Sequence, residues 1–318
     1  MLKNKKILSC VIIGSGPAGY SAALYSARAE LKPILYTGIK PGGQLINSLC
    51  VENYPGYPEG INGYDLMEKF KKQAIKFGTK VKYNSVVKIE FSKEKIPVHT
   101  LLLNNKKIIK TYGIIIATGS YPKYLGLKNE KKFLGKGVSV CATCDGFFYR
   151  KKIAAIVGGG NTALEEAIYL SKICKKVYLI IRGNNLKASK IHQKFIKKIK
   201  NIKIFFNYEV KDLIGDEKNF LKKIKLINNK TKKKKILYLN VLFIAIGYSP
   251  NTEIFIGKIA LNKKNYIITD KKNMCTNIPG VFAAGDVQDY IYRQAITSAG
   301  TGCMAALDLE KYLSNIIK

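Results

Sequence analysis

A repeated unit constrains the fold of this chain more than any other feature: an apolar run, a glycine-rich turn and a helical stretch. The first copy has an apolar run at 7–13, the turn G-S-G-P-A-G at 14–19 and a helical stretch over 20–29. The second copy has its run at 152–157, the turn G-G-G-N-T-A at 158–163 and a helical stretch over 164–171. A continuous apolar run suits a parallel strand buried on both faces. Each copy therefore predicts the strand, turn and helix that open a nucleotide-binding unit.

A second pair of matching segments closes the two copies. The run G-I-I-I-A-T-G-S-Y-P at 113–122 resembles V-L-F-I-A-I-G-Y-S-P at 241–250. We therefore expect an α/β protein with two Rossmann-like, doubly wound domains. The segment after 250 has no third glycine turn, but its strand-like V-F-A-A-G-D at 281–286 should pack back on the first domain. This predicts a first domain of 1–119 and 249–318, into which a second domain of 120–248 is inserted.

Two such turns predict two cofactors, and the residues that follow the second strand of each unit indicate which cofactor belongs to which domain. In such turns the glycines permit a tight bend and a close approach to a pyrophosphate at the helix N-terminus. The first unit has L-Y-T-G at 35–38, without the usual ribose-binding acid, and a flavin suits it. In the second unit the strand 177–181 is followed by Arg182 and Lys187, which suit the 2′-phosphate of NADPH. The alternative is that these are two ordinary exposed cations.

Asp286 supports a flavin in the first domain, so 1–119 with 249–318 is the predicted FAD-binding domain and 120–248 the predicted NADPH-binding domain. A carboxylate at the end of a strand, beside a helix start, can bind the ribitol hydroxyls of FAD. The alternative is that Asp286 caps the next helix.

The pair Cys141 and Cys144 forms a C-x-x-C motif, and Asp145 follows it directly. A zinc site would need a second pair or nearby histidines, and His99 and His192 are distant in sequence, so no metal is expected. A redox-active dithiol is the better interpretation, since this spacing brings two sulfurs within bonding reach. Asp145 is a candidate proton donor or acceptor for a thiolate, or else an acid at a helix start.

Three aromatic residues, Phe147 to Tyr149, follow the cysteine pair. They form either part of the core or a docking surface for a protein substrate. Cys10 and Cys303 lie in apolar or small-residue stretches and are expected to fill the core.

The charge of the chain is unusual: 55 Lys and Arg against 21 Asp and Glu in 318 residues give a formal net charge of +34. The lysines are spread along the sequence, and the densest run, 232–235, predicts a hairpin tip. Compositional drift explains this charge, or it steers an acidic protein partner. No groove-reading motif or basic stripe with stacking aromatics is present, so specific nucleic-acid binding is not expected.

The cellular location follows from the apolar segments and the cysteines. No segment approaches the ~18 apolar residues that a membrane span needs. Residues 3–13 imitate a secretory signal but lack a small-residue cleavage site. Seven cysteines, an odd number, argue against a disulfide framework, so a cytoplasmic protein is expected.

Motifs along the whole chain are similar to those of the low-molecular-weight, bacterial-type thioredoxin reductases, which are class II pyridine nucleotide-disulfide oxidoreductases. Besides the two glycine turns, the matches are G-G-Q-L at 42–45, V-E-N-Y-P-G at 51–56, C-A-T-C-D-G-F-F-Y-R at 141–150, G-V-F-A-A-G-D at 280–286 and I-Y-R-Q-A-I-T-S-A-G-T-G-C-M-A-A-L-D at 291–308. The resemblance implies an NADPH-dependent oxidoreductase that is homodimeric.

The resemblance also implies individual roles. Cys144 would face the flavin, Cys141 would attack the disulfide of thioredoxin, Asp145 would be the acid, and Phe147 and Phe148 would contact thioredoxin. The residues implied at FAD are Gly14, Ser15, Gly16, Pro17, Ala18, Gly19, Gly43, Gln44, Asn53, Gly285, Asp286, Arg293, Gln294 and Ala295. Those implied at NADPH are Gly158, Gly160, Asn161, Thr162, Ala163, Arg182 and Lys187.

The expected reaction passes electrons from NADPH to FAD, then to the Cys141–Cys144 disulfide, and then to thioredoxin. Because dithiol and nicotinamide must both approach the flavin, the inserted domain should rotate about 119–122 and 247–250. The family typically has H-R-R-x-x-x-R where this chain has I-R-G-N-N-L-K at 181–187, so a weaker preference for NADPH over NADH is predicted. The alternative function is a related flavin disulfide reductase that serves a peroxidase. Such enzymes carry an extra N-terminal domain, whereas this chain starts at its first strand.

Overall fold

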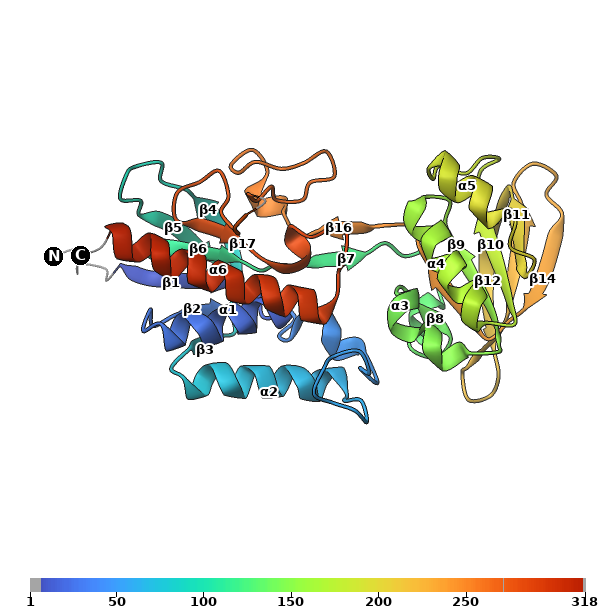
Figure 1. Cartoon of the computed structure of the whole chain (residues 1–318), viewed down its shortest axis with the longest axis horizontal. Helices are drawn as coiled ribbons and strands as arrows, with labels where there is room; N and C mark the ends of the chain where they lie inside the picture. Colours follow the sequence, from blue (N-terminus) through green and yellow to red (C-terminus); the bar gives the residue numbers. More distant parts are fainter. Residues whose placement is uncertain (1–6, 271, 317–318) are drawn as a thin grey trace. The chain divides into compact units, whose positions relative to one another are not determined.

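The computed structural model describes residues 7–270 and 272–316, so residues 3–6 of the signal-like stretch lie outside it (Figure 1). The chain divides into two compact units, one formed by Met1–Tyr121 with Ser249–Lys318 and the other by Pro122–Tyr248. The predicted α/β class is confirmed. That the first unit holds FAD and the second NADPH stays a prediction.

The first unit contains a seven-stranded sheet in the order β3-β2-β1-β6-β5-β4, with β17 also paired to β6. The pairings among β1, β2, β3, β6 and β17 are parallel, and those of β4 with β5 and of β5 with β6 are antiparallel. The strands are β1 (Leu8–Ile13), β2 (Ile34–Tyr36), β3 (Lys80–Lys82), β4 (Val86–Glu90), β5 (His99–Leu103), β6 (Ile108–Ile116) and β17 (Val281–Ala283).

Two apolar layers cover this sheet. Along β1, Cys10 and Ile12 face a core shared with the helices, while Val11 and Ile13 face a core shared with β4, β5 and residues 255–278. Burial of both faces explains why the sequence of β1 is continuously apolar. The helices of the unit are α1 (Pro17–Arg28), α2 (Gly63–Lys76) and α6 (Ala295–Ile316), with the 3₁₀ turns η1 (Gly43–Asn47), η4 (Glu253–Phe255) and η5 (Gly285–Val287).

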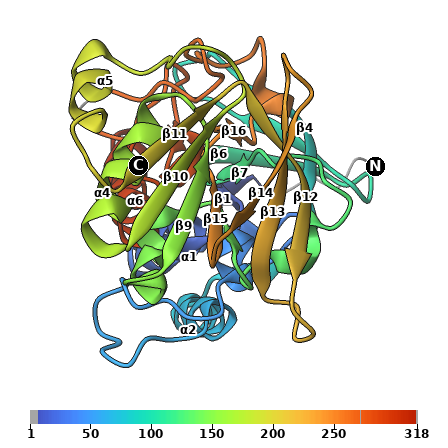
Figure 2. The ribbon, with the colours of Figure 1, turned by 90° about the vertical axis from the view of Figure 1, so that its right-hand side faces the viewer.

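The second unit contains a five-stranded parallel sheet in the order β11-β10-β9-β15-β8. One face packs on α3, α4 and α5, and the other on an antiparallel sheet of β12, β13 and β14 (Figure 2). The strands are β8 (Val138–Ser139), β9 (Ile153–Val157), β10 (Lys176–Ile181), β11 (Ile202–Phe206), β12 (Tyr208–Gly215), β13 (Leu221–Asn228), β14 (Lys234–Tyr238) and β15 (Val241–Ile244). The helices are α3 (Ala142–Asp145), α4 (Asn161–Ile173) and α5 (Lys190–Ile196), with η2 (Glu130–Phe133) and η3 (Gly146–Tyr149).

The chain passes between the two units in two short strands, β7 (Ser120–Pro122) and β16 (Tyr248–Pro250), which pair with each other. Each strand follows a glycine with positive φ, +70° at Gly119 and +105° at Gly247. A Cβ atom at either glycine would meet nothing within 4 Å. Both glycines therefore occupy open positions whose backbone conformation L residues rarely adopt.

Three details correct the sequence predictions. Helices α1 and α4 begin inside the glycine turns, at Pro17 and Asn161, because the residue just before each helix is itself a glycine of the turn; proline also suits the first helical turn of α1. Of the lysine run 232–235, the last two residues lie in β14 and only the first two in the turn. Cys303 is only partly buried on α6 and does not fill the core, whereas Cys10 does.

Candidate active site

Cys141 and Cys144 are joined by a disulfide at the start of α3. Cys141 caps the N-terminus of this short helix, and its Sγ accepts a hydrogen bond from the Cys144 amide at 3.2 Å. The Cys141 amide in turn donates to the Ser139 hydroxyl at 3.1 Å, at the end of β8. The C-x-x-C motif therefore lies at the carboxyl end of a strand of the second unit, held by backbone contacts on both sides.

Asp145 is the last residue of the four-residue helix α3 and still belongs to its first turn, so the alternative of an acid at a helix start is confirmed for its position. Burial raises the pKa of its carboxyl group, and a hydrogen bond with Ser139 partly offsets this rise. A carboxyl group with a raised pKa holds its proton closer to neutral pH than an exposed one does. Ser139, Cys141 and Asp145 thus form one small polar cluster, in which the Ser139 hydroxyl contacts the other two residues.

The three aromatic residues after Asp145 divide between core and surface. Tyr149 packs edge-on against Phe243, with ring centroids 6.3 Å apart, and its carbonyl oxygen accepts from the Cys174 thiol at 3.3 Å. Phe147 and Phe148 are 54% and 41% exposed, and the Arg150 guanidinium lies over the Phe147 ring at 5.0 Å. The core interpretation therefore holds for Tyr149 and is wrong for the two phenylalanines.

The first glycine turn joins β1 to α1. Gly14 has φ +109° and its amide donates to the Tyr36 carbonyl at 2.8 Å. A Cβ at Gly14 would lie 2.2 Å from the Ala117 carbonyl oxygen, and one at Gly19 would lie 2.1 Å from the Gly14 carbonyl oxygen. Gly16 precedes α1 without a side-chain cap, and a Cβ there would meet nothing within 4 Å. The turn thus leaves the helix N-terminus open to an anion.

Ser15 connects this turn to the loop before η1. Its buried hydroxyl donates to the Thr37 carbonyl at 3.0 Å and accepts from the Gly42 amide at 3.0 Å. A Cβ at Gly43 would lie 3.1 Å from the Gly16 Cα. Gln44 in η1 donates from its side-chain amide to the Ser120 carbonyl. These contacts bring Gly43, predicted from a distant motif, directly against the glycine turn.

Asp286 lies in η5, where Gly285 has φ +74° and a Cβ on that glycine would lie 2.8 Å from the Ala18 side chain. The Asp286 carboxylate accepts from the Ser298 hydroxyl at 3.0 Å, so it does not cap α6, which begins at Ala295. Burial raises the pKa of Asp286 to about 6. A buried carboxylate with one partner has unused acceptor capacity beside the start of α1.

Two more predicted FAD residues meet across the unit. The Asn53 side-chain amide donates to the Gln294 side-chain oxygen at 3.2 Å. Arg293, immediately before it, has φ +49°, and its amide donates to the Asp289 carboxylate at 3.3 Å. The segment 289–295 is thus folded tightly before α6 begins.

The second glycine turn joins β9 to α4 in the same way. Gly158 has φ +150° and its amide donates to the Ile180 carbonyl at 3.1 Å. Gly160 caps α4 without a side-chain bond, and a Cβ there would meet nothing within 4 Å. Ala163 is fully buried, while Asn161 accepts from the Ser189 amide at 2.8 Å. Thr162, between them, is the second residue of α4.

Arg182 and Lys187 are exposed in the loop that follows β10. The Lys187 amide donates to the Gly159 carbonyl at 2.7 Å, so this loop folds directly against the second glycine turn. In the part of the chain that the structure describes, neither side chain forms an ion pair. Both cations remain available to a ligand at the turn.

Sequence reasoning missed several partners of these residues. The Asn229 side-chain amide donates to the Arg182 carbonyl at 3.1 Å and to the Glu209 carboxylate at 3.1 Å. Hydrogen bonding from Lys211 is the main cause that lowers the pKa of Glu209, and the nearby Arg182 contributes. Ser139 and Ser298 were likewise not predicted. None of these residues belongs to a motif, so only their position in the fold identifies them.

Within residues 7–270 and 272–316, no group of three or more His, Cys, Asp or Glu side chains could hold a metal ion. Over the same residues, no helix has both the length and the apolar character that crossing a membrane requires.

Known proteins similar to this chain share one family. The family model described as pyridine nucleotide-disulphide oxidoreductase matches residues 8–302. A thioredoxin reductase of Buchnera aphidicola subsp. Schizaphis graminum is 48% identical over 323 residues, covering 99% of each chain. The thioredoxin reductase of Coxiella burnetii is 45% identical over 315 residues, covering 97% of each chain.

Solved structures agree with these relatives. The thioredoxin reductase from Giardia duodenalis matches with a TM-score of 0.92 at 35% identity, covering 98% of this chain and 100% of that one. The thioredoxin reductase from Streptococcus pyogenes MGAS5005 matches with a TM-score of 0.90 at 35% identity, covering 98% of this chain and 99% of that one.

Proposed function

Since this chain belongs to the pyridine nucleotide-disulphide oxidoreductases and, within them, to the thioredoxin reductases, we propose that it uses NADPH and FAD to reduce the disulfide of thioredoxin. The observation that carries this proposal is the Cys141–Cys144 disulfide, which lies in the same unit as the second glycine turn. A redox-active disulfide beside a nicotinamide-type turn suits an enzyme that moves reducing equivalents to another disulfide.

The residues of the first unit fit FAD. Gly14, Gly16 and Gly19 leave the start of α1 open to a pyrophosphate, and the Asp286 carboxylate lies beside it with capacity to accept hydrogen bonds from ribitol hydroxyls. FAD, when bound, supplies a group that accepts a hydride from NADPH and delivers two electrons to a disulfide. We assign Gln44, Asn53 and the residues 293–295 to this site as well.

The residues of the second unit fit NADPH. The open start of α4 at Gly160 suits the pyrophosphate, and the exposed Arg182 and Lys187 suit the 2′-phosphate. Ala163 leaves this turn intact because its side chain packs entirely inside the unit. With one arginine and one lysine at the 2′-phosphate, the preference for NADPH over NADH should be modest.

The exchange with thioredoxin follows from the geometry of α3. After reduction of the disulfide, the Cys144 amide that now donates to Cys141 Sγ favours the thiolate of Cys141. This thiolate attacks one sulfur of the thioredoxin disulfide and forms a mixed disulfide, releasing the other thioredoxin sulfur as a thiolate. Cys144 then attacks Cys141, re-forming the disulfide and releasing reduced thioredoxin, and Asp145 exchanges protons with the departing thiolates. The exposed Phe147 and Phe148 provide the docking surface.

We infer a rotation of the second unit between the two half-reactions. The supporting observation is that β7 and β16 are short and follow Gly119 and Gly247, whose surroundings are open. We also infer a homodimer in the cytoplasm. Five cysteines of the described residues are free thiols, which suits a reducing compartment.

The test is a steady-state assay of the purified yellow protein with NADPH and oxidised thioredoxin, measured as loss of NADPH absorbance. Wild type should oxidise NADPH only when thioredoxin is present, and Cys144→Ser should lose this activity. Cys174→Ser, which alters a free buried thiol outside the pair, is the matched control and should stay active. Reduction of the flavin without thioredoxin turnover in the wild type would contradict the substrate assignment.

A further inference from the structure

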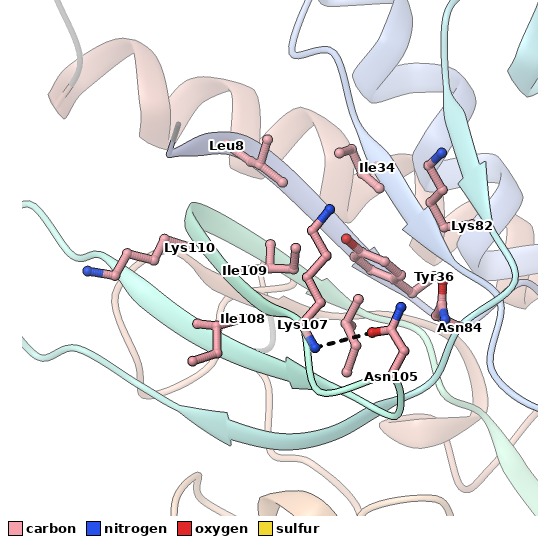
Figure 3. A pocket seen from close by; sticks show the side chains of 11 residues that line it. Leu8, Ile34, Tyr36, Lys82, Asn84, Asn105, Lys107, Ile108, Ile109 and Lys110 are labelled. Carbon is pink, nitrogen blue, oxygen red and sulfur yellow. Dashed lines mark hydrogen bonds between the residues drawn. The ribbon is translucent and has the colours of Figure 1, made fainter. Parts of the chain in front are cut away.

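A pocket of about 450 Å³ lies in the first unit, and none of its lining residues is among the cofactor-binding or redox residues assigned above (Figure 3). It opens between the strands β1, β2 and β3 on one side and the β5–β6 hairpin on the other. Its volume is in the range of small-molecule sites. The lining residues are Leu8, Ile34, Tyr36, Lys82, Asn84, Leu103, Asn105, Lys107, Ile108, Ile109 and Lys110.

The walls of the pocket are apolar. Leu8 and Ile34 come from the strands β1 and β2, and Leu103 and Ile109 come from β5 and β6. All four pack against the core on the sheet face opposite the helices. Leu8 and Ile34 are only partly buried, so apolar surface remains to be covered.

Tyr36 supplies a hydroxyl group that faces this space. The residue is only 4% exposed, and its hydroxyl end points into the pocket in Figure 3. That hydroxyl makes no hydrogen bond with any residue the structure describes. Burial raises the pKa of Tyr36, so the hydroxyl keeps its proton and can donate it in a hydrogen bond. The hydroxyl is not one of the buried side-chain atoms of the described residues that lack a partner, so it is open to the pocket, where a ligand oxygen can accept its hydrogen bond.

The charged side chains that line the pocket are all positive. Lys82, Lys107 and Lys110 line it, and no Asp or Glu does. Among the described residues, none of these three lysines forms an ion pair. The Lys107 side chain extends over the Tyr36 side of the pocket, and the dashed line in Figure 3 marks the bond of its backbone amide to Asn105 at 3.2 Å. The pocket therefore selects a negative charge.

We propose that this pocket binds a small organic carboxylate, with the acid group at the Tyr36 hydroxyl and the Lys107 ammonium and the apolar body against Leu8, Ile34 and Ile109. The apolar walls exclude inorganic phosphate as the preferred ligand, since it would leave them uncovered. The cluster of lysines excludes a neutral or cationic molecule of the same shape. The proposal does not depend on the reductase activity.

The experiment is a calorimetric titration of the purified flavoprotein with octanoate as the probe. Octanoate should bind saturably at one site with an affinity of about 1 mM or tighter. The alcohol of the same chain length should bind at least about tenfold more weakly, because it has no charge for the lysines. Inorganic phosphate should compete poorly. Equal binding of octanol and octanoate, or no saturable binding of octanoate, would overturn the proposal.

Substitutions of lining residues test whether octanoate binds in this pocket. Tyr36→Phe and Lys107→Gln should each weaken octanoate binding by about three- to tenfold, which is the contribution of one hydrogen bond or charge contact. Lys80→Gln is the matched control, because Lys80 belongs to β3 like Lys82 but does not line the pocket, and it should bind as the wild type does. Tyr36→Phe keeps the ring and removes a hydroxyl without a partner, so its melting temperature should not fall. Wild-type affinity in both pocket variants, or an equal loss in Lys80→Gln, would refute the site.

Discussion

The two glycine turns of this chain have nearly the same backbone and different surroundings. In both, the first glycine has a positive φ and donates its amide to the second strand, Gly14 to Tyr36 at 2.8 Å and Gly158 to Ile180 at 3.1 Å. In both, a glycine without a side-chain cap precedes the helix. This shared geometry suits the binding of a pyrophosphate that we propose for either unit.

The differences lie at the third turn position and after the second strand. Gly19 leaves no room for a Cβ, which would lie 2.1 Å from the Gly14 carbonyl oxygen, whereas the second turn accommodates Ala163. After the second strand, the first unit continues with Thr37 and the second with Arg182. We infer that the turn sets the class of ligand, a dinucleotide, and that residues outside the turn decide which dinucleotide each unit binds.

Gly19→Ala should have the largest effect. The added methyl group must displace the backbone of the first turn, and we expect a loss of about 3 kcal/mol or more in the free energy of unfolding, with loss of flavin. Urea denaturation and the flavin absorbance of the purified protein measure both effects. A yellow protein of wild-type stability would contradict the tight packing of this turn.

Asp286→Asn should remove a pH dependence of stability that comes from one buried carboxyl group of the first unit. In the flavin-free chain the pKa of Asp286 is raised to about 6, so ionisation of this carboxyl destabilises the fold. Its contribution to stability is present at low pH and is lost as the pH rises through about 6, by up to about 3 kcal/mol.

Urea denaturation of the flavin-free wild type and variant between pH 4 and pH 7.5 checks this. The wild type should lose stability relative to Asp286→Asn as the pH rises. The difference in unfolding free energy between the two proteins removes the contributions of other titrating groups. One such group is His99, whose pKa is lowered by burial to about 4. A difference that does not change with pH would show that Asp286 is not buried as described.

Arg182→Gln should separate the two nicotinamide coenzymes. Removing this cation should raise the KM for NADPH about tenfold and leave the KM for NADH nearly unchanged, since only NADPH carries the 2′-phosphate. Lys190→Gln, an exposed lysine at the start of α5, serves as the control. If both coenzymes weaken equally, Arg182 does not contact the 2′-phosphate.

Ala163→Gly should have the smallest effect. It restores the third glycine of the second turn, and we expect it to cost about 1 kcal/mol, because glycine in a helix is less favourable than alanine. Urea denaturation measures the change, and coenzyme KM values should not move. A gain in NADPH affinity would mean that Ala163 hinders the approach of the coenzyme.

Most of the fold could be predicted from local patterns in the sequence. The repeated run, turn and helix predicted the parallel sheet of the second unit and the parallel part of the sheet in the first, because burial on two faces favours a continuous apolar strand. The helix starts at Pro17 and Asn161 were placed three residues too late, since a glycine turn and a helix N-terminus overlap in sequence.

Only those residues of the candidate site that belong to a sequence motif could be predicted from the sequence. Cys141, Cys144 and the turn glycines belong to fixed spacings. The partners Ser139, Ser298 and Asn229 do not, because each is brought to its site by strand or helix packing over many residues. The pocket at Tyr36 is of the same kind, since its residues come from five strand segments and their loops.

The central claim is that the two turns hold two cofactors and that the Cys141–Cys144 disulfide is a further electron acceptor in the same chain. An anaerobic titration with NADPH, following flavin absorbance and free thiols, tests it most directly. Full reduction of the wild type should consume about two equivalents per chain, one for FAD and one for the disulfide, and Cys144→Ser should consume about one. An equal requirement of one equivalent in both proteins would contradict the account.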